Sequence, residues 1–155
     1  MNTLTLFHVI ISFVALSAGF VIAWGMLTRR PLNLWHAIFL ITTVATNATG
    51  FLFPFKELLP SHILAVISLV VLAVAIYAYY GAKLAGRWRS VYAITAILAF
   101  YVNFFVLLVQ AFLKVPVLNA LAPTQQEPPF LIAQTLALVA FGVLGWLVTK
   151  RFKAS

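Results

Sequence analysis

Long apolar stretches alternate along the chain with short polar segments. A bilayer core about 30 Å thick is crossed by about 20 helical residues. Five stretches have this length, and they are Leu4–Leu27, Leu34–Phe53, Ser61–Ala82, Ser90–Leu113 and Phe130–Thr149. The pattern predicts an all-α fold with one transmembrane domain, residues 1–155, built from five membrane-spanning helices.

The connections between these stretches predict how the helices are arranged. Three of the four are short, and all seven prolines lie in these connections, where no helical N–H is needed. Short connections place consecutive helices antiparallel, as in an up-and-down bundle. The longest connection, residues 114–129, combines an apolar start with four prolines. We expect it to form a short element on the membrane surface that folds over the outer mouth of the bundle.

Basic residues predict the orientation of the bundle, because cytoplasmic loops are enriched in Lys and Arg. Lys56 and Lys114 lie on the same predicted side as the two acidic residues, Glu57 and Glu127. The other eight basic residues lie on the opposite side: Arg29, Arg30, Lys83, Arg87, Arg89, Lys150, Arg151 and Lys153. Tryptophan favours membrane interfaces, and Trp24, Trp35, Trp88 and Trp146 all fall on this basic side. The N-terminus is therefore predicted outside and the C-terminus in the cytoplasm.

Composition favours a lipid environment and excludes several classes of function. The chain is 65% hydrophobic and 8% charged, whereas a soluble domain has about 25% charged residues. Its net charge is +8, but the basic residues are spread over short loops and not clustered as in a nucleic-acid binder. Cysteine is absent, and no residues form a recognisable nucleophile, base and orienting group. We therefore expect no catalytic residues and a binding protein in place of an enzyme.

Polar residues within the apolar stretches lie mostly in the halves that face outside. Because an unpaired amide is costly in hydrocarbon, their helix faces are expected to point into the bundle. We predict that they line a periplasm-facing polar cavity that binds a lipophilic small molecule or a lipid. The predicted ligand-binding residues are His8, Ser12, Asn47, His62, Asn103, Gln110 and Gln134.

Helix packing is an alternative explanation of the same residues. Small and polar side chains join membrane helices, at about 0.6 kcal/mol for an average hydrogen bond. A stripe such as Ser12, Ala15 and Gly19 needs no other role. In this interpretation the protein is an accessory or scaffold subunit of a homo-oligomer or of a larger membrane complex.

The histidines offer a second alternative. His8 and His62 lie at similar predicted depth on different helices and could ligate one b-type haem. The same pair with Glu57 or Glu127 could hold a metal ion, although no ligand spacing motif supports a metal site. His36 follows Trp35 and is expected to be an interfacial or capping side chain. Tyr77, Tyr79 and Tyr80 are expected to be interfacial anchors.

Three segments carry a family resemblance that extends along nearly the whole chain. They are Thr49–Phe55, Lys114 through Gln125, and Glu127–Phe130. They resemble a group of small uncharacterised bacterial five-span inner-membrane proteins with no known activity. The resemblance implies a multi-pass protein of the bacterial inner (plasma) membrane, with membrane lipids as its surroundings.

Overall fold

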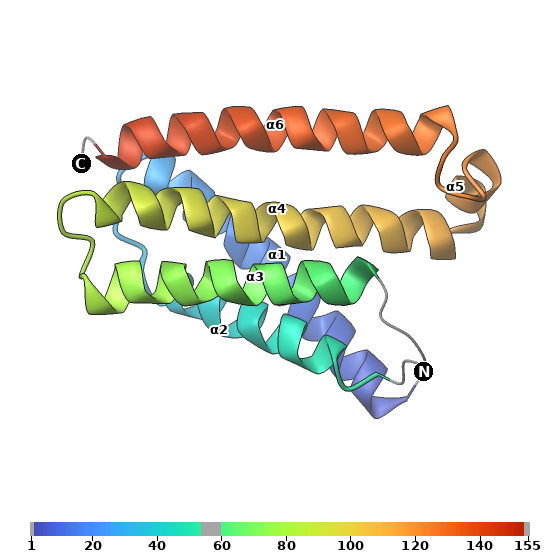
Figure 1. Ribbon diagram of the computed structural model, residues 1–155, viewed down its shortest axis with the longest axis horizontal. Coiled ribbons are helices and arrows are strands. Elements are labelled where there is room, and N and C mark those ends of the chain that lie inside the picture. The colour runs from blue at the N-terminus through green and yellow to red at the C-terminus, as the bar shows by residue number, and fades with distance from the viewer. Residues whose placement is uncertain (1, 54–59, 154–155) are drawn as a thin grey trace.

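The computed structural model describes residues 2–53 and 60–153, and this part of the chain is helical throughout apart from its connections (Figure 1). The helices are α1 (Thr3–Leu27), α2 (Asn33–Gly50), α3 (Pro60–Ile76), α4 (Trp88–Lys114), α5 (Pro116–Leu121) and α6 (Pro128–Lys153). A π-helical turn, η1 (Tyr77–Gly81), continues α3. The all-α prediction is thus confirmed for the described residues.

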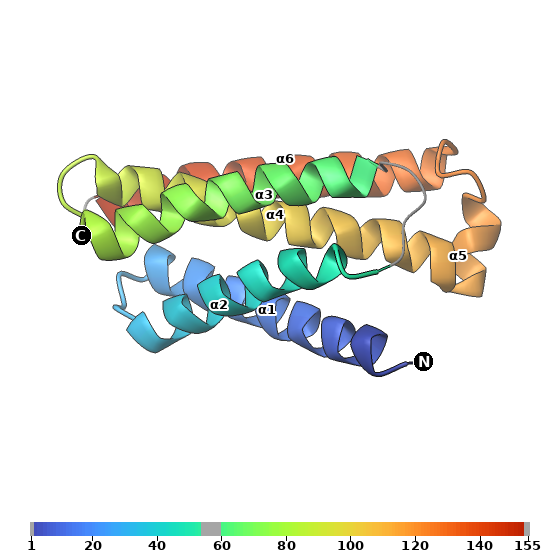
Figure 2. The same cartoon turned by 60° about the horizontal axis from the view of Figure 1, so that its bottom comes forward.

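The five long helices run alternately in opposite directions (Figure 1). The α1–α2 connection, the α3–α4 connection and the end of α6 lie together, and we call this the basic end of the bundle. The N-terminus and α5 lie at the opposite end. Figure 2 shows two layers, one of α1 and α2 and the other of α3, α4 and α6.

Four of the described helices are long and apolar enough to cross a membrane. They are α1, α3 together with η1, α4 and α6. Large apolar side chains on α6 face outward, including Leu136 and Trp146, which are 65% and 60% exposed. Such a surface requires lipid, and the protein is therefore a multi-pass membrane protein. The shorter α2 is not among these four.

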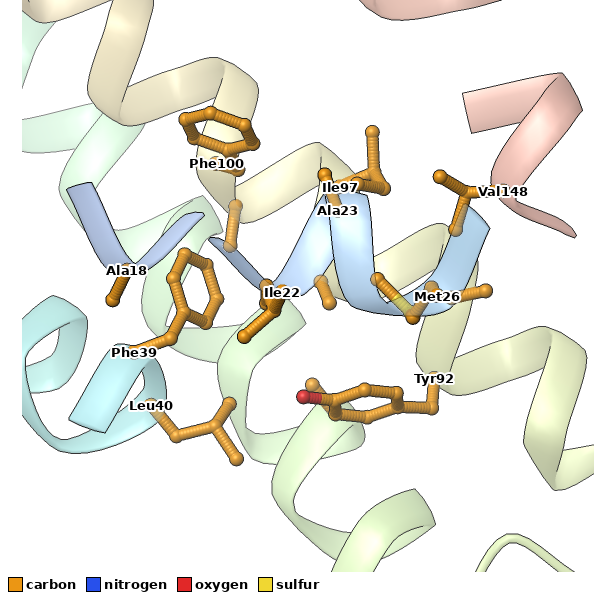
Figure 3. Packing of buried hydrophobic residues seen from close by; sticks show 14 of the residues in the cluster. Ala18, Ile22, Ala23, Met26, Phe39, Leu40, Tyr92, Ile97, Phe100 and Val148 are labelled. Carbon is orange, nitrogen blue, oxygen red and sulfur yellow. The ribbon is translucent and has the colours of Figure 1, made fainter. Parts of the chain in front are cut away.

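Helix α4 is the centre of the bundle, since it packs against α1, α3, α5 and α6. The layers meet in a core of aromatic, aliphatic and alanine side chains (Figure 3). Phe39 from α2 and Phe100 from α4 are both fully buried, with their rings 6.4 Å apart. Apolar packing of this kind, with small residues between large ones, is how membrane helices associate.

Gly19 permits the close contact between α1 and α4. A Cβ atom added at this position would lie 2.5 Å from Cδ1 of Phe100. The neighbouring Ala15, Ala18 and Ala23 are also buried, so this face of α1 consists mainly of small side chains. Within the predicted stripe, Ala15 and Gly19 are therefore packing residues, whereas Ser12 is only partly buried.

The connection between α4 and α6 folds against the ends of these two helices. Phe112, Ala122 and Phe130 form a small apolar cluster of their own. The amide of Gln125 donates to the Val109 carbonyl at 2.9 Å. Helix α5 packs against α4 (Figure 1). The predicted short element is present as α5, and its position on the membrane surface over the outer mouth of the bundle stays a prediction.

Candidate functional site

Two of the predicted site residues, Asn47 and Asn103, belong to a buried hydrogen-bonded cluster that joins three helices. The side-chain amide of Asn47 on α2 donates to the Thr43 carbonyl at 2.8 Å and to the Ser68 hydroxyl at 3.2 Å. Asn103 on α4 donates to the Thr43 hydroxyl at 3.4 Å. Thr43, Asn47 and Ser68 are all buried. These groups satisfy one another, as polar residues do at helix–helix contacts in membranes.

His8 and Ser12 form a second group, between α1 and the end of α2. His8 Nδ1 lies 2.7 Å from the Thr49 hydroxyl, and the His8 ring meets the Phe53 ring edge-on at 5.2 Å. The Ser12 hydroxyl donates to the His8 carbonyl at 2.6 Å within α1. One imidazole nitrogen of His8 is therefore already engaged by a neighbouring helix.

His62 also lies beside the end of α2. Its ring stacks on Phe51 with the centroids 5.9 Å apart, and the residue is 7% exposed. Haem ligation by His8 and His62 stays a prediction. Among the described residues, no group of three or more His, Cys, Asp or Glu side chains comes together as a metal site. Glu57, the other suggested ligand, lies outside the described residues.

Glu127 holds the loop before α6. It accepts hydrogen bonds from the Thr124 amide and hydroxyl, the latter at 2.7 Å, and from the Gln126 amide. The hydrogen bond from the Thr124 side chain is the main cause that lowers the pKa of this carboxyl from its ordinary value. Glu127 thus has a structural role.

The two predicted glutamines occupy different environments. Gln110 on α4 is exposed on the outside of the bundle. Gln134 on α6 has both amide atoms buried, and neither has a hydrogen-bond partner in the part of the chain that the structure describes. A buried amide without partners costs about 1–3 kcal/mol, so native proteins rarely leave one unpaired. Gln134 is therefore the predicted residue with unused binding capacity.

Two apolar grooves open on the outside of the bundle. The first, of about 410 Å³, lies between α1, α4 and α6, and Phe20, Leu108, Ala137 and Phe141 are among its lining residues. The second, of about 430 Å³, lies between α4 and α6 nearer the basic end. None of the seven predicted residues lines either groove. Gln134 nevertheless shares a helix face with Ala137 and Phe141, three and seven residues further along α6.

A group at the basic end was not predicted. His36 is 2% exposed, and its Nδ1 lies 2.6 Å from the hydroxyl of the fully buried Tyr92. The His36 ring also stacks on Tyr79, whose hydroxyl donates to Asn33 at 2.7 Å. Tyr79 belongs to the π-helical turn η1, a distortion that is common at functional sites.

The prediction that His36 is an interfacial or capping side chain did not include its burial against Tyr92. Its position next to Trp35 correctly placed His36 near the start of α2, but it did not indicate which neighbouring helix the side chain faces. Asn33 and His36 are three residues apart and share a helix face. That spacing was the available signal for a common cluster.

No protein-family model matches this sequence, and comparisons with curated proteins and with solved structures find no match either.

Proposed function

We propose that the chain crosses the bacterial inner membrane five times. Helix α2 is then a span in addition to α1, α3 with η1, α4 and α6. Helix α2 has 18 residues, which at 1.5 Å per residue is about 27 Å. Its low hydropathy comes from polar side chains that are satisfied inside the protein. Thr42 and Thr46 donate to the carbonyls of Ile38 and Thr42, four residues earlier, at 2.6 and 2.7 Å. Such internal pairing is what a lipid environment requires.

The same proposal places the basic end in the cytoplasm. Arg29, Arg87 and Arg151 are exposed at this end. Trp24, Trp35 and Trp88 lie in the first or last turn of their helices there, and Trp146 lies about two turns before the end of α6. Positive charge on the cytoplasmic side and tryptophan at the interface support this orientation.

The proposed function is to bind a membrane-resident lipophilic molecule that carries one hydrogen-bonding group. Such a molecule would enter from the lipid into the first groove, between α1, α4 and α6. Ligand sites are mostly apolar, with a few polar groups that fix the ligand's orientation. The buried, unpartnered amide of Gln134 carries this proposal. The site differs from the predicted polar cavity, because His8, Ser12, Asn47 and Asn103 already have hydrogen-bond partners within the protein.

A scaffold role is the second candidate, and the cluster of Thr43, Asn47, Ser68 and Asn103 favours it. These side chains are used in contacts between helices. A scaffold subunit binds no ligand, however, so this function does not explain the buried, unpartnered amide of Gln134. Binding of a lipophilic probe therefore distinguishes the two candidates.

We expect oleamide to stabilise the purified protein in detergent, and 1-octadecene, which lacks the amide, to stabilise it much less. A ligand at 100 times its Kd adds about 2.7 kcal/mol, which corresponds to a rise of about 5 °C or more in the thermal midpoint. Gln134→Leu should abolish the difference between the two probes. It should also make the free protein more stable by about 1–3 kcal/mol, because an unpaired buried amide is removed.

Gln110→Leu is the matched control, since it makes the same change at an exposed position on α4. It should keep the full response to oleamide. An equal response of Gln134→Leu and the unmodified chain to oleamide would refute the proposed site. An equal response of the unmodified chain to both probes would leave the scaffold as the better account.

A further inference from the structure

The second groove has a shape suited to an extended hydrocarbon chain. It runs between α4 and α6, with Ile94 and Leu98 on one side and Gly142 and Gly145 on the other. A Cβ atom at Gly142 would meet no atom within 4 Å, and one at Gly145 would lie 3.6 Å from Ile97. The absence of side chains at these positions therefore keeps the groove open along α6.

Two basic side chains, Lys150 and Arg87, lie near the end of this groove that is closer to the basic end of the bundle. Trp146 lines the groove, and Nζ of Lys150 lies 4.4 Å from the centre of its ring. Arg87 immediately precedes α4, is exposed, and comes seven residues before Ile94. Residues seven apart share a helix face, so Arg87 lies on the groove side of α4.

No acidic side chain at this end of the bundle offsets these cations. The connections at this end and the last turns of α6 contain no Asp or Glu in the sequence. Lys150 and Arg87 lie beyond the lining residues and supply two positive charges, one from the end of each helix that bounds the groove. Along the groove toward the basic end, an apolar channel is therefore followed by Trp146 and then by two cations.

We propose that this groove is a binding site for an anionic phospholipid. One acyl chain lies between α4 and α6 along Gly142 and Gly145, and the phosphate is held by Lys150 and Arg87. Basic pockets between membrane helices select anionic head groups in this way. The site shares Phe141 with the first groove but opens elsewhere, and it does not depend on the proposed function of Gln134.

The test is a titration of the purified full-length chain in neutral detergent, read by native mass spectrometry. The probes are phosphatidylglycerol and phosphatidylcholine with the same acyl chains. Phosphatidylglycerol should bind more tightly. Lys150→Gln and Arg87→Gln should each weaken its binding about fivefold, since a basic residue near the membrane surface contributes about that factor. Arg29→Gln, at the same end but in the α1–α2 connection, removes an equal charge and should leave the affinity within about twofold.

A second variant tests the acyl-chain channel separately from the charges. Gly142→Leu fills the groove without a steric clash at Cβ. It should weaken the binding of phosphatidylglycerol and leave the thermal midpoint of the protein unchanged. Equal binding of the two phospholipids, or an equal loss with Arg29→Gln and Lys150→Gln, would overturn the proposal. So would displacement of the lipid by inorganic phosphate at matched concentration, which would indicate a site for the free anion.

Discussion

Replacing Gly19 by alanine is expected to destabilise the protein by about 1–3 kcal/mol, the usual cost of overpacking a core. The added methyl group would lie 2.5 Å from the Phe100 ring, and Phe100 is fully buried at the centre of α4. Neither helix can yield locally, because α1 is also held by α2, and α4 is also held by α3 and α6. Reversible unfolding in mixed micelles, or the thermal midpoint, measures the loss.

Gly142→Ala is the control for this prediction. It makes the same change in a helix, but its Cβ meets open space. Since alanine is the better helix former, by up to about 1 kcal/mol, this variant should be unchanged or slightly more stable. Equal stability of the two variants would show that α1 and α4 do not pack as closely as described.

Tyr92→Phe is expected to cost about 1–3 kcal/mol, because it leaves a buried imidazole nitrogen without a partner. The Tyr92 hydroxyl and His36 Nδ1 are 2.6 Å apart, and both residues are buried between α2 and α4. Removal of the hydroxyl leaves the shape of the ring unchanged. The loss therefore measures the hydrogen bond and not the packing.

Tyr101→Phe is the matched control, since the Tyr101 hydroxyl makes no hydrogen bond with the described part of the chain and should be dispensable. A double-mutant cycle of Tyr92→Phe with His36→Leu should give a coupling energy of about 0.5–3 kcal/mol. Additive effects of the two substitutions would show that the residues do not interact.

The long helices were predictable because the bilayer sets both their length and their composition. The stretch Leu4–Leu27 corresponds to α1 within one residue at its start. The end of α2 was placed at Phe53 and lies at Gly50. Apolar residues continue past Gly50, so hydropathy alone does not locate the end of this helix.

The partners of the polar residues could not be predicted, because sequence gives the depth of a residue but not the direction in which its helix faces. Gln110 and Gln134 have the same side chain at similar predicted depth, yet one is exposed and the other has its amide buried. Ser68 lies within an apolar stretch, and only the structure shows that its hydroxyl accepts a hydrogen bond from Asn47. His36 and Tyr92 are 56 residues apart in the chain. Such pairs depend on which helices are neighbours in the bundle, and the apolar pattern does not predict this arrangement.

The most direct test of the account is whether α2 crosses the membrane. The chain has no cysteine, so a single introduced cysteine is the only target of a membrane-impermeant maleimide. Thr3→Cys and Gln126→Cys are exposed positions at the end opposite the basic end, and Ala85→Cys is exposed at the basic end. With five spans, intact spheroplasts should label Thr3→Cys and Gln126→Cys, and Ala85→Cys should react only after lysis. With four spans, Thr3 and Gln126 would lie on opposite sides, and labelling of only one of the two would contradict the account.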